Sequence, residues 1–238
     1  GSEMCIRDRN FIIIAQQVLV LFILIAVGFI CGKKKIITDF SARHMTDIVL
    51  YVVTPCVMIS AFQREFSFEL LSGLIICVTC SALIFAVSIL ICNLIFHDKD
   101  ESRKAVIRFA TIYSNCAFMG IPLVSALYGS EGVFYLTAFV TVFNLFVWTH
   151  GVFLMEEKLN KKMIIQAVKT PAVIATFLGF ALFMLKISLP DILLKTLTYL
   201  ENLNTPLAML AAGATIAQTN IFKALKNPRL YYLSLIHI

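Results

Sequence analysis

The sequence predicts an all-α transmembrane protein: an inverted five-helix repeat fold with broken crossover helices, truncated in the second repeat. Hydrophobic residues make up 60% of the 238 residues and charged residues 14%, whereas soluble globular chains carry about 25% charged residues. The apolar residues form long runs, one run is interrupted by glycine and proline, and one stretch repeats later in the chain. A soluble globular protein is therefore excluded.

Seven apolar runs have the length of a transmembrane helix. About 20 residues at 1.5 Å per residue cross the roughly 30 Å of bilayer hydrocarbon. The first run lacks a small-residue cleavage site and continues into three lysines, so it is not read as a cleavable signal peptide. An eighth run begins after Arg229. The seven predicted helices are Asn10–Cys31, His44–Phe62, Leu70–Phe96, Ala105–Leu127, Val133–Met155, Lys169–Leu185 and Asn204–Phe222.

Basic residues alternate from loop to loop, which predicts the orientation of the chain. Lys33–Lys35 and Lys158–Lys162 lie in basic loops, whereas the turn Tyr128–Gly132 holds no basic residue. Cytoplasmic loops carry an excess of Lys and Arg. We therefore expect a multi-pass protein of the cell (inner) membrane with its N-terminus outside. The net charge of +6 is interpreted as a topology signal. The lipid bilayer is the expected partner of the chain, and no nucleic acid is expected as a partner.

A shift of 151 residues places Gly28–Ala61 on Gly179–Ala212, with Thr54-Pro55 on Thr205-Pro206. Five predicted crossings separate the matched points, so the second unit enters the membrane in the opposite sense, as in inverted-repeat transporters. Coincidental similarity of apolar helices is the alternative. The predicted organisation is a first five-helix repeat at 10–155 and a partial second repeat at 163–232, with two full helices and the start of a third. Residues 1–9 and 233–238 resemble non-native ends.

The fourth run contains the main candidate for a binding site. Pro122 removes a backbone donor and Gly120 weakens the helix beside it, which predicts an interruption. Freed backbone groups in hydrocarbon must find partners or line a wet cavity. Thr111, Asn115, Met119 and Pro122 share one face at helical spacing. The prediction is a substrate site of one amide and half-helix ends; an ordinary proline kink is the alternative.

Further candidates lie on other runs. Thr137, Thr141, Asn144 and Trp148 share a face of the fifth run, and Asp47, Tyr51, Thr54 and Met58 share a face of the second. Asp47 is one turn from the cytoplasmic end and is the candidate for ion coupling. The predicted substrate-binding residues are Asn115, Ser114, Met119, Gly120, Pro122, Thr54, Pro55, Thr205, Pro206 and Asn144.

The string Asn115-x-x-Phe118-Met119-Gly120-Ile121-Pro122-Leu123, with Thr205-Pro206-Leu207-Ala208-Met209-Leu210 and Lys169-Thr170-Pro171-Ala172, resembles the prokaryotic branch of the auxin efflux carrier family. That family is similar in fold to bile-acid sodium symporters. The resemblance implies ten helices in two inverted repeats, with helices four and nine broken and helix nine beyond Ile238. It also implies a secondary active transporter of an organic anion, such as malate or malonate, working by alternating access.

Two other classes of protein are weighed. A seven-helix membrane receptor or binding protein matches the helix count but does not explain the repeat. A membrane enzyme would need an intramembrane nucleophile or metal set, and the sequence shows no such motif. No catalytic residue, metal or cofactor is therefore expected. The sequence leaves open whether H⁺ or Na⁺ is coupled, whether the chain forms a homodimer, and whether it folds as given.

Overall fold

The computed structural model of the chain describes residues 2–96, 101–113, 116–156, 165 and 168–218. All regular structure in these residues is helical, with no strand. Two short π-helices, η1 and η2, interrupt longer helices. The elements are α1 (Ser2–Lys33), α2 (Asp39–Ile48), η1 (Val49–Val53), α3 (Thr54–Ala61), α4 (Phe68–Ile95), α5 (Glu101–Ile112), α6 (Gly120–Phe146), η2 (Val147–Gly151), α7 (Val152–Glu156), α9 (Pro171–Met184), α10 (Asp191–Glu201) and α11 (Asn204–Gln218).

Within the described residues, four helical stretches are long and apolar enough to cross a membrane, and seven were predicted. The four are Phe11–Lys33, Asp39–Ala61, Phe68–Ile95 and Gly120–Met155. The predicted sixth run forms α9, whose 14 residues span about 21 Å, less than the hydrocarbon thickness. The predicted seventh run forms the 15 residues of α11, and its last positions lie outside the described residues.

The helix boundaries in the predicted fourth and fifth runs differ from the prediction. The fourth run divides into α5 and the first arm of α6, and α6 continues past the predicted turn at Tyr128–Gly132. Gly129 nevertheless has φ 62° and ψ −154°, a conformation open almost only to glycine. A Cβ on Gly132 would lie 2.8 Å from Val124 Cγ1, although residues eight apart in a straight helix are about 12 Å apart. The chain therefore reverses at Gly129, which confirms the predicted turn.

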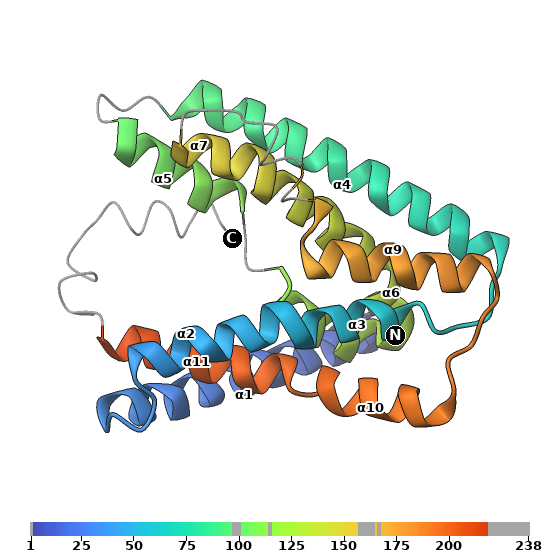
Figure 1. Cartoon of the computed structure of the whole chain (residues 1–238), viewed down its shortest axis with the longest axis horizontal. Helices are drawn as coiled ribbons and strands as arrows, with labels where there is room; N and C mark the ends of the chain where they lie inside the picture. Colours follow the sequence, from blue (N-terminus) through green and yellow to red (C-terminus); the bar gives the residue numbers. More distant parts are fainter. Residues whose placement is uncertain (1, 97–100, 114–115, 157–164, 166–167, 219–238) are drawn as a thin grey trace.

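The helices pack in two layers. In Figure 1, α1, α2, α3, α10 and α11 form one layer, α4, α5 and α7 form the other, and α6 and α9 lie between them. The most extensive pairings join α1 to α11 and α3 to α9. Close approach of α1 and α11 requires glycine, since a Cβ on Gly28 would lie 2.8 Å from Leu210 Cα. Phe62 fills the core beside α9 and is 1% exposed.

The outer faces of the long helices are apolar. On α4, Phe68, Ile76 and Leu94 are 81%, 61% and 68% exposed. Such faces suit lipid, because a soluble protein rarely exposes large contiguous apolar surface. Together with the four membrane-length stretches, these faces identify a multi-pass membrane protein.

Two helix ends that are 151 positions apart have the same geometry. Lys35 follows α1 with φ 59°, and Lys186 follows α9 with φ 58°. At the first end, Lys34, Lys35 and Ile36 donate their backbone N–H groups to Ile30, Gly32 and Cys31. Leu185, Lys186 and Ile187 donate in the same order to Ala181, Phe183 and Leu182. Each of these six residues at the second end is shifted by 151 from its counterpart at the first.

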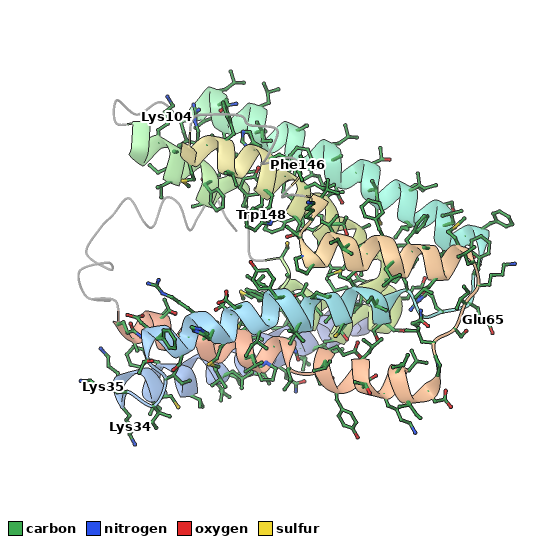
Figure 2. The ribbon with its side chains drawn as sticks, in the orientation of Figure 1. Lys34, Lys35, Glu65, Lys104, Phe146 and Trp148 are labelled. Atoms are coloured by element: carbon green, nitrogen blue, oxygen red, sulfur yellow. The ribbon has the colours of Figure 1, made fainter. Side chains whose placement is uncertain are left out.

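The two lysine-terminated helix ends lie at opposite ends of the molecule. Figure 2 shows Lys34 and Lys35 at the same end as Lys104, and Glu65 at the other end. Lys186 lines a small cavity together with Glu65. The turn after Gly129 also lies near Glu65, because Arg64 donates a hydrogen bond of 3.2 Å to Ser130 Oγ.

Candidate functional site

The predicted interruption of the fourth run is present. Helix α5 ends at Ile112 and α6 begins at Gly120 with Met119 as its N-cap. Pro122 is the third residue of α6, in the first turn, where a missing N–H group is tolerated. The helical spacing assumed for the predicted shared face from Thr111 to Pro122 is interrupted, because Tyr113 and residues 116–119 are not helical. Ser114 and Asn115 lie outside the described residues.

One side of the break is tied to the π-helix η2. The Tyr113 hydroxyl lies 3.0 Å from the Phe146 carbonyl oxygen and 2.9 Å from His150 Nδ1. Since the carbonyl only accepts, Tyr113 donates to Phe146, and His150 Nδ1–H then donates to the phenol oxygen. These two bonds fix the end of α5 against η2. They require Nδ1 to carry a proton.

The second run contains a π-helix directly before its proline. Pro55 has no N–H group to donate to the preceding turn. The Thr54 hydroxyl and the Thr54 backbone N–H both bond the Val49 carbonyl oxygen, the hydroxyl at 2.8 Å. A π-turn inserts one residue into the helix and rotates the residues after it about the helix axis.

The side chains of the predicted shared face of the second run differ in exposure. Tyr51 is 59% exposed, whereas Thr54 and Met58 are 3% and 1% exposed. Asp47 is exposed on α2 and lines no described cavity.

A cavity of about 440 Å³ opens beside the break, within the range of about 300–1,000 Å³ found for small-molecule sites. Figure 2 shows Trp148 on the side of η2 that is turned toward α2. The cavity wall comes from the second run, the break, the end of the α6 hairpin and the start of α9. It consists of Leu50, Tyr51, Thr54, Cys116, Ala117, Phe118, Val140, Phe143, Asn144, Trp148, Lys169, Thr170, Pro171 and Ala172.

The polar side chains of this first cavity can hold an anion. Lys169 supplies a positive charge, and among the described residues no acidic side chain lines the cavity. Asn144 Nδ2 donates to the Val140 carbonyl oxygen at 2.8 Å, which leaves its Oδ1 and second N–H for other partners. Thr137 and Thr141, predicted on the same face, lie elsewhere: Thr137 is 1% exposed and the Thr141 hydroxyl donates to Thr176 at 3.0 Å.

A second cavity, of about 300 Å³, lies on the other side of the break. Pro122 and Thr205, both predicted site residues, line it together with Asn204. Along α3, Thr54 lines the first cavity, Met58 belongs to a buried apolar cluster, and Ser60 lines the second. That cluster joins Met58 to Val140 and Ala175.

The structure therefore brings together only part of the predicted site. Thr54 and Asn144 line the first cavity, and Pro122 and Thr205 line the second, whereas Met119, Gly120, Pro55 and Pro206 line neither. Sequence reasoning did not select Lys169, Thr170, Glu201 or Asn204 as site residues. Lys169-Thr170-Pro171 was interpreted as a helix start and as part of the family resemblance, although a lysine at the start of an apolar helix was also a signal for an anion site.

Comparison with known proteins decides the family. A family model described as membrane transport protein matches residues 13–166. The chain belongs to the membrane transport protein family. This agrees with the resemblance to auxin efflux carriers.

A relative from Methanocaldococcus jannaschii, described as an uncharacterized transporter, is 24% identical over 219 residues, which cover 88% of this chain and 70% of the relative. Membership of the membrane transport protein family supports a transporter that contacts the bilayer and a transported substrate. It favours a carrier over an enzyme or a receptor. The break between α5 and α6 lies within the residues that match the family.

Proposed function

We propose that this membrane transport protein is a secondary active carrier that moves a small organic anion, a mono- or dicarboxylate, past the broken fourth helix by alternating access. The observation that carries the proposal is the first cavity. It combines the charge of Lys169 and the amide of Asn144 with an apolar wall at a helix break. In hydrocarbon, irregular backbone is stable only where it is buried in protein or lines such a cavity.

An inverted repeat is part of the proposal. The matching ends at Lys35 and Lys186 support two equivalent units, and their location at opposite ends of the molecule supports opposite orientations. The offset of 151 residues makes α9 the counterpart of α1, and α11 the counterpart of α3. The pairing of α1 with α11 then matches the pairing of α9 with α3. Carriers built this way place substrate sites between the two units.

The break resembles an anion site in its electrostatics. The N-terminus of the second half-helix, at Gly120, carries a partial positive charge that favours an anion by about 0.3–1 kcal/mol. Asn115 is proposed to add an uncharged donor, which attracts a carboxylate while leaving it releasable. Thr54, on the side of the first cavity, and Pro122, on the side of the second, are proposed to flank the carboxylate's path past the break together with Ser114, Met119 and Gly120. Pro55, Thr205 and Pro206 are proposed to shape the paired helix starts.

The orientation completes the proposal. Lys34, Lys35 and Lys104 lie at one end of the molecule (Figure 2), which fits a cytoplasmic end in the inner membrane and an outside N-terminus. The exposed Asp47 is one candidate for coupling to H⁺ or Na⁺.

Transport by the purified chain tests this function. Proteoliposomes containing the chain should take up radiolabelled malonate faster than protein-free liposomes, and unlabelled malonate inside should accelerate the uptake by exchange. Equilibrium binding of malonate without any flux would instead indicate a receptor. Absence of both binding and flux would refute malonate as a substrate of this chain.

A further inference from the structure

The second cavity contains a buried amide without partners. Asn204 begins α11, directly after the joint that separates α11 from α10. It is 2% exposed, and neither its Nδ2 nor its Oδ1 has a hydrogen-bond partner among the described residues. A buried polar group without a partner costs about 1–3 kcal/mol. Asn204 lines the cavity, but both amide atoms are closed to solvent, so a ligand in the cavity reaches them when the side chain rotates toward it.

Asn204 selects the kind of group that can bind. A primary amide presents a donor and an acceptor side by side. A neutral carboxylic acid matches both, because its O–H donates to Oδ1 and its C=O accepts from Nδ2–H. A primary carboxamide matches both in the same way. A carboxylate only accepts, so it would leave Oδ1 without a partner.

The charges around the second cavity also favour a neutral ligand. Glu201 lines the cavity, and no Lys, Arg or His does so in the part of the chain that the structure describes. The N-terminus of α11 supplies about half a positive charge, less than the full negative charge of Glu201. Arg64 does not line this cavity but lies behind Ser130, which does. The Arg64 guanidinium donates to Ser130 Oγ at 3.2 Å and lies over the Phe134 ring. Glu131, next to Ser130, lines a different cavity.

We propose that the second cavity binds the neutral, protonated form of a small carboxylic acid through paired hydrogen bonds to Asn204. This proposal deepens the proposed function, because it assigns one protonation form of the carried acid to each cavity. The first cavity, where the described lining includes Lys169 and no acidic side chain, suits the anion. Along α3, Thr54 lines the first cavity, and Val57, Ser60 and Ala61, which follow it, line the second.

Butyramide is a probe for the second cavity, because it presents the same donor and acceptor as a neutral acid and does not ionise. Radiolabelled butyramide should bind the purified chain equally at pH 6 and pH 7.5. Unlabelled butyrate should compete with butyramide about 30-fold less well at pH 7.5 than at pH 6. The reason is that the concentration of the neutral acid falls tenfold for each pH unit above its pKa. Competition that does not change with pH, or the absence of butyramide binding, would overturn the proposal without any variant.

Variants test whether butyramide binds at Asn204. Asn204→Ala should weaken butyramide binding at least tenfold, whereas Asn202→Ala, an exposed asparagine on the rim of the same cavity, should leave it unchanged. Glu201→Gln should reduce the pH dependence of butyrate competition, because the anion is then less strongly repelled. Equal binding by the Asn204 and Asn202 variants would overturn the assignment.

The outcomes separate the two proposals. Butyramide binding that depends on Asn204, without malonate flux, would refute the carrier function alone. Malonate flux with butyrate competition that does not change with pH would refute the neutral-acid site alone.

Discussion

Lys35 and Lys186 are the two non-glycine residues with positive φ in the described part of the chain, at 59° and 58°, and they are 151 positions apart. Each lysine follows an apolar helix and donates the middle one of three backbone hydrogen bonds that have the same pattern at both ends. Helices commonly end with a glycine in this conformation. That a lysine occupies it twice, at the offset of the sequence repeat, indicates that the two ends are equivalent.

Glycine at these two positions should stabilise the protein. The left-handed conformation costs a residue with a Cβ roughly 1–2 kcal/mol, and glycine lacks this cost. Lys35→Gly and Lys186→Gly should each raise the melting temperature in detergent by a few degrees. Lys34→Gly is the matched control and should lower it or leave it unchanged. Opposite shifts for Lys35→Gly and Lys186→Gly would contradict the equivalence of the two ends.

The Thr54 hydroxyl should contribute to stability through the π-helix. Thr54→Val keeps the shape of the side chain but removes the donor to the Val49 carbonyl oxygen, at a cost of about 1–3 kcal/mol. Thr79→Val is the control, because exposed Thr79 makes an ordinary bond to Ile75 one turn earlier. Thermal melting in detergent compares the two. If both variants melted alike, the buried bond at Thr54 would have no special role.

Much of this arrangement follows from local sequence, and some of it does not. Pro122 and Gly120 indicated the break, and Gly129 lies in the predicted turn, because proline and glycine act on the backbone through their own geometry. The π-helix at Val49–Val53 was not predicted, although Tyr51 and Thr54 of the expected face both line the first cavity. A single inserted residue leaves no mark in the periodicity of an apolar run.

The cavities were less predictable than the helices. Lys169 and Asn144 meet at the first cavity although 25 positions separate them, and Asn204 lies across from Pro122. Such neighbours depend on how helices pack, which the pattern of one helix does not specify. The short α9 has a different, local cause, because its ends are set by Pro171 and by the Lys186 cap, not by hydropathy.

Lys169 should strengthen substrate binding more than it affects turnover. It is exposed at the mouth of the first cavity, where a screened charge contributes about 0.2–1 kcal/mol. Lys169→Gln should raise the KM for malonate about two- to fivefold with little change in kcat. Lys195→Gln, an exposed lysine on α10, is the control. Malonate uptake measured over a range of concentrations gives both constants, and an unchanged KM would exclude Lys169 from the site.

The two ends of the molecule should face opposite sides of the membrane. In a chain freed of its native cysteines, Lys34→Cys should react with an impermeant maleimide only from the cytoplasmic side. Tyr128→Cys, whose side chain is 71% exposed in the native chain, should react only from outside. Labelling of both from the same side would remove the inverted arrangement.

The role of Asn115 tests the central claim, transport of an organic anion at the broken helix, most directly. Malonate uptake into proteoliposomes should fall at least tenfold in Asn115→Ala, equivalent to about 1.4 kcal/mol. It should fall further in Asn115→Asp, which places a negative charge against the anion. Asn93→Ala, an exposed asparagine on α4, should transport as the unmodified chain does, and all three variants should melt normally. Normal uptake by Asn115→Ala, or loss of uptake only through unfolding, would contradict a substrate site at the break.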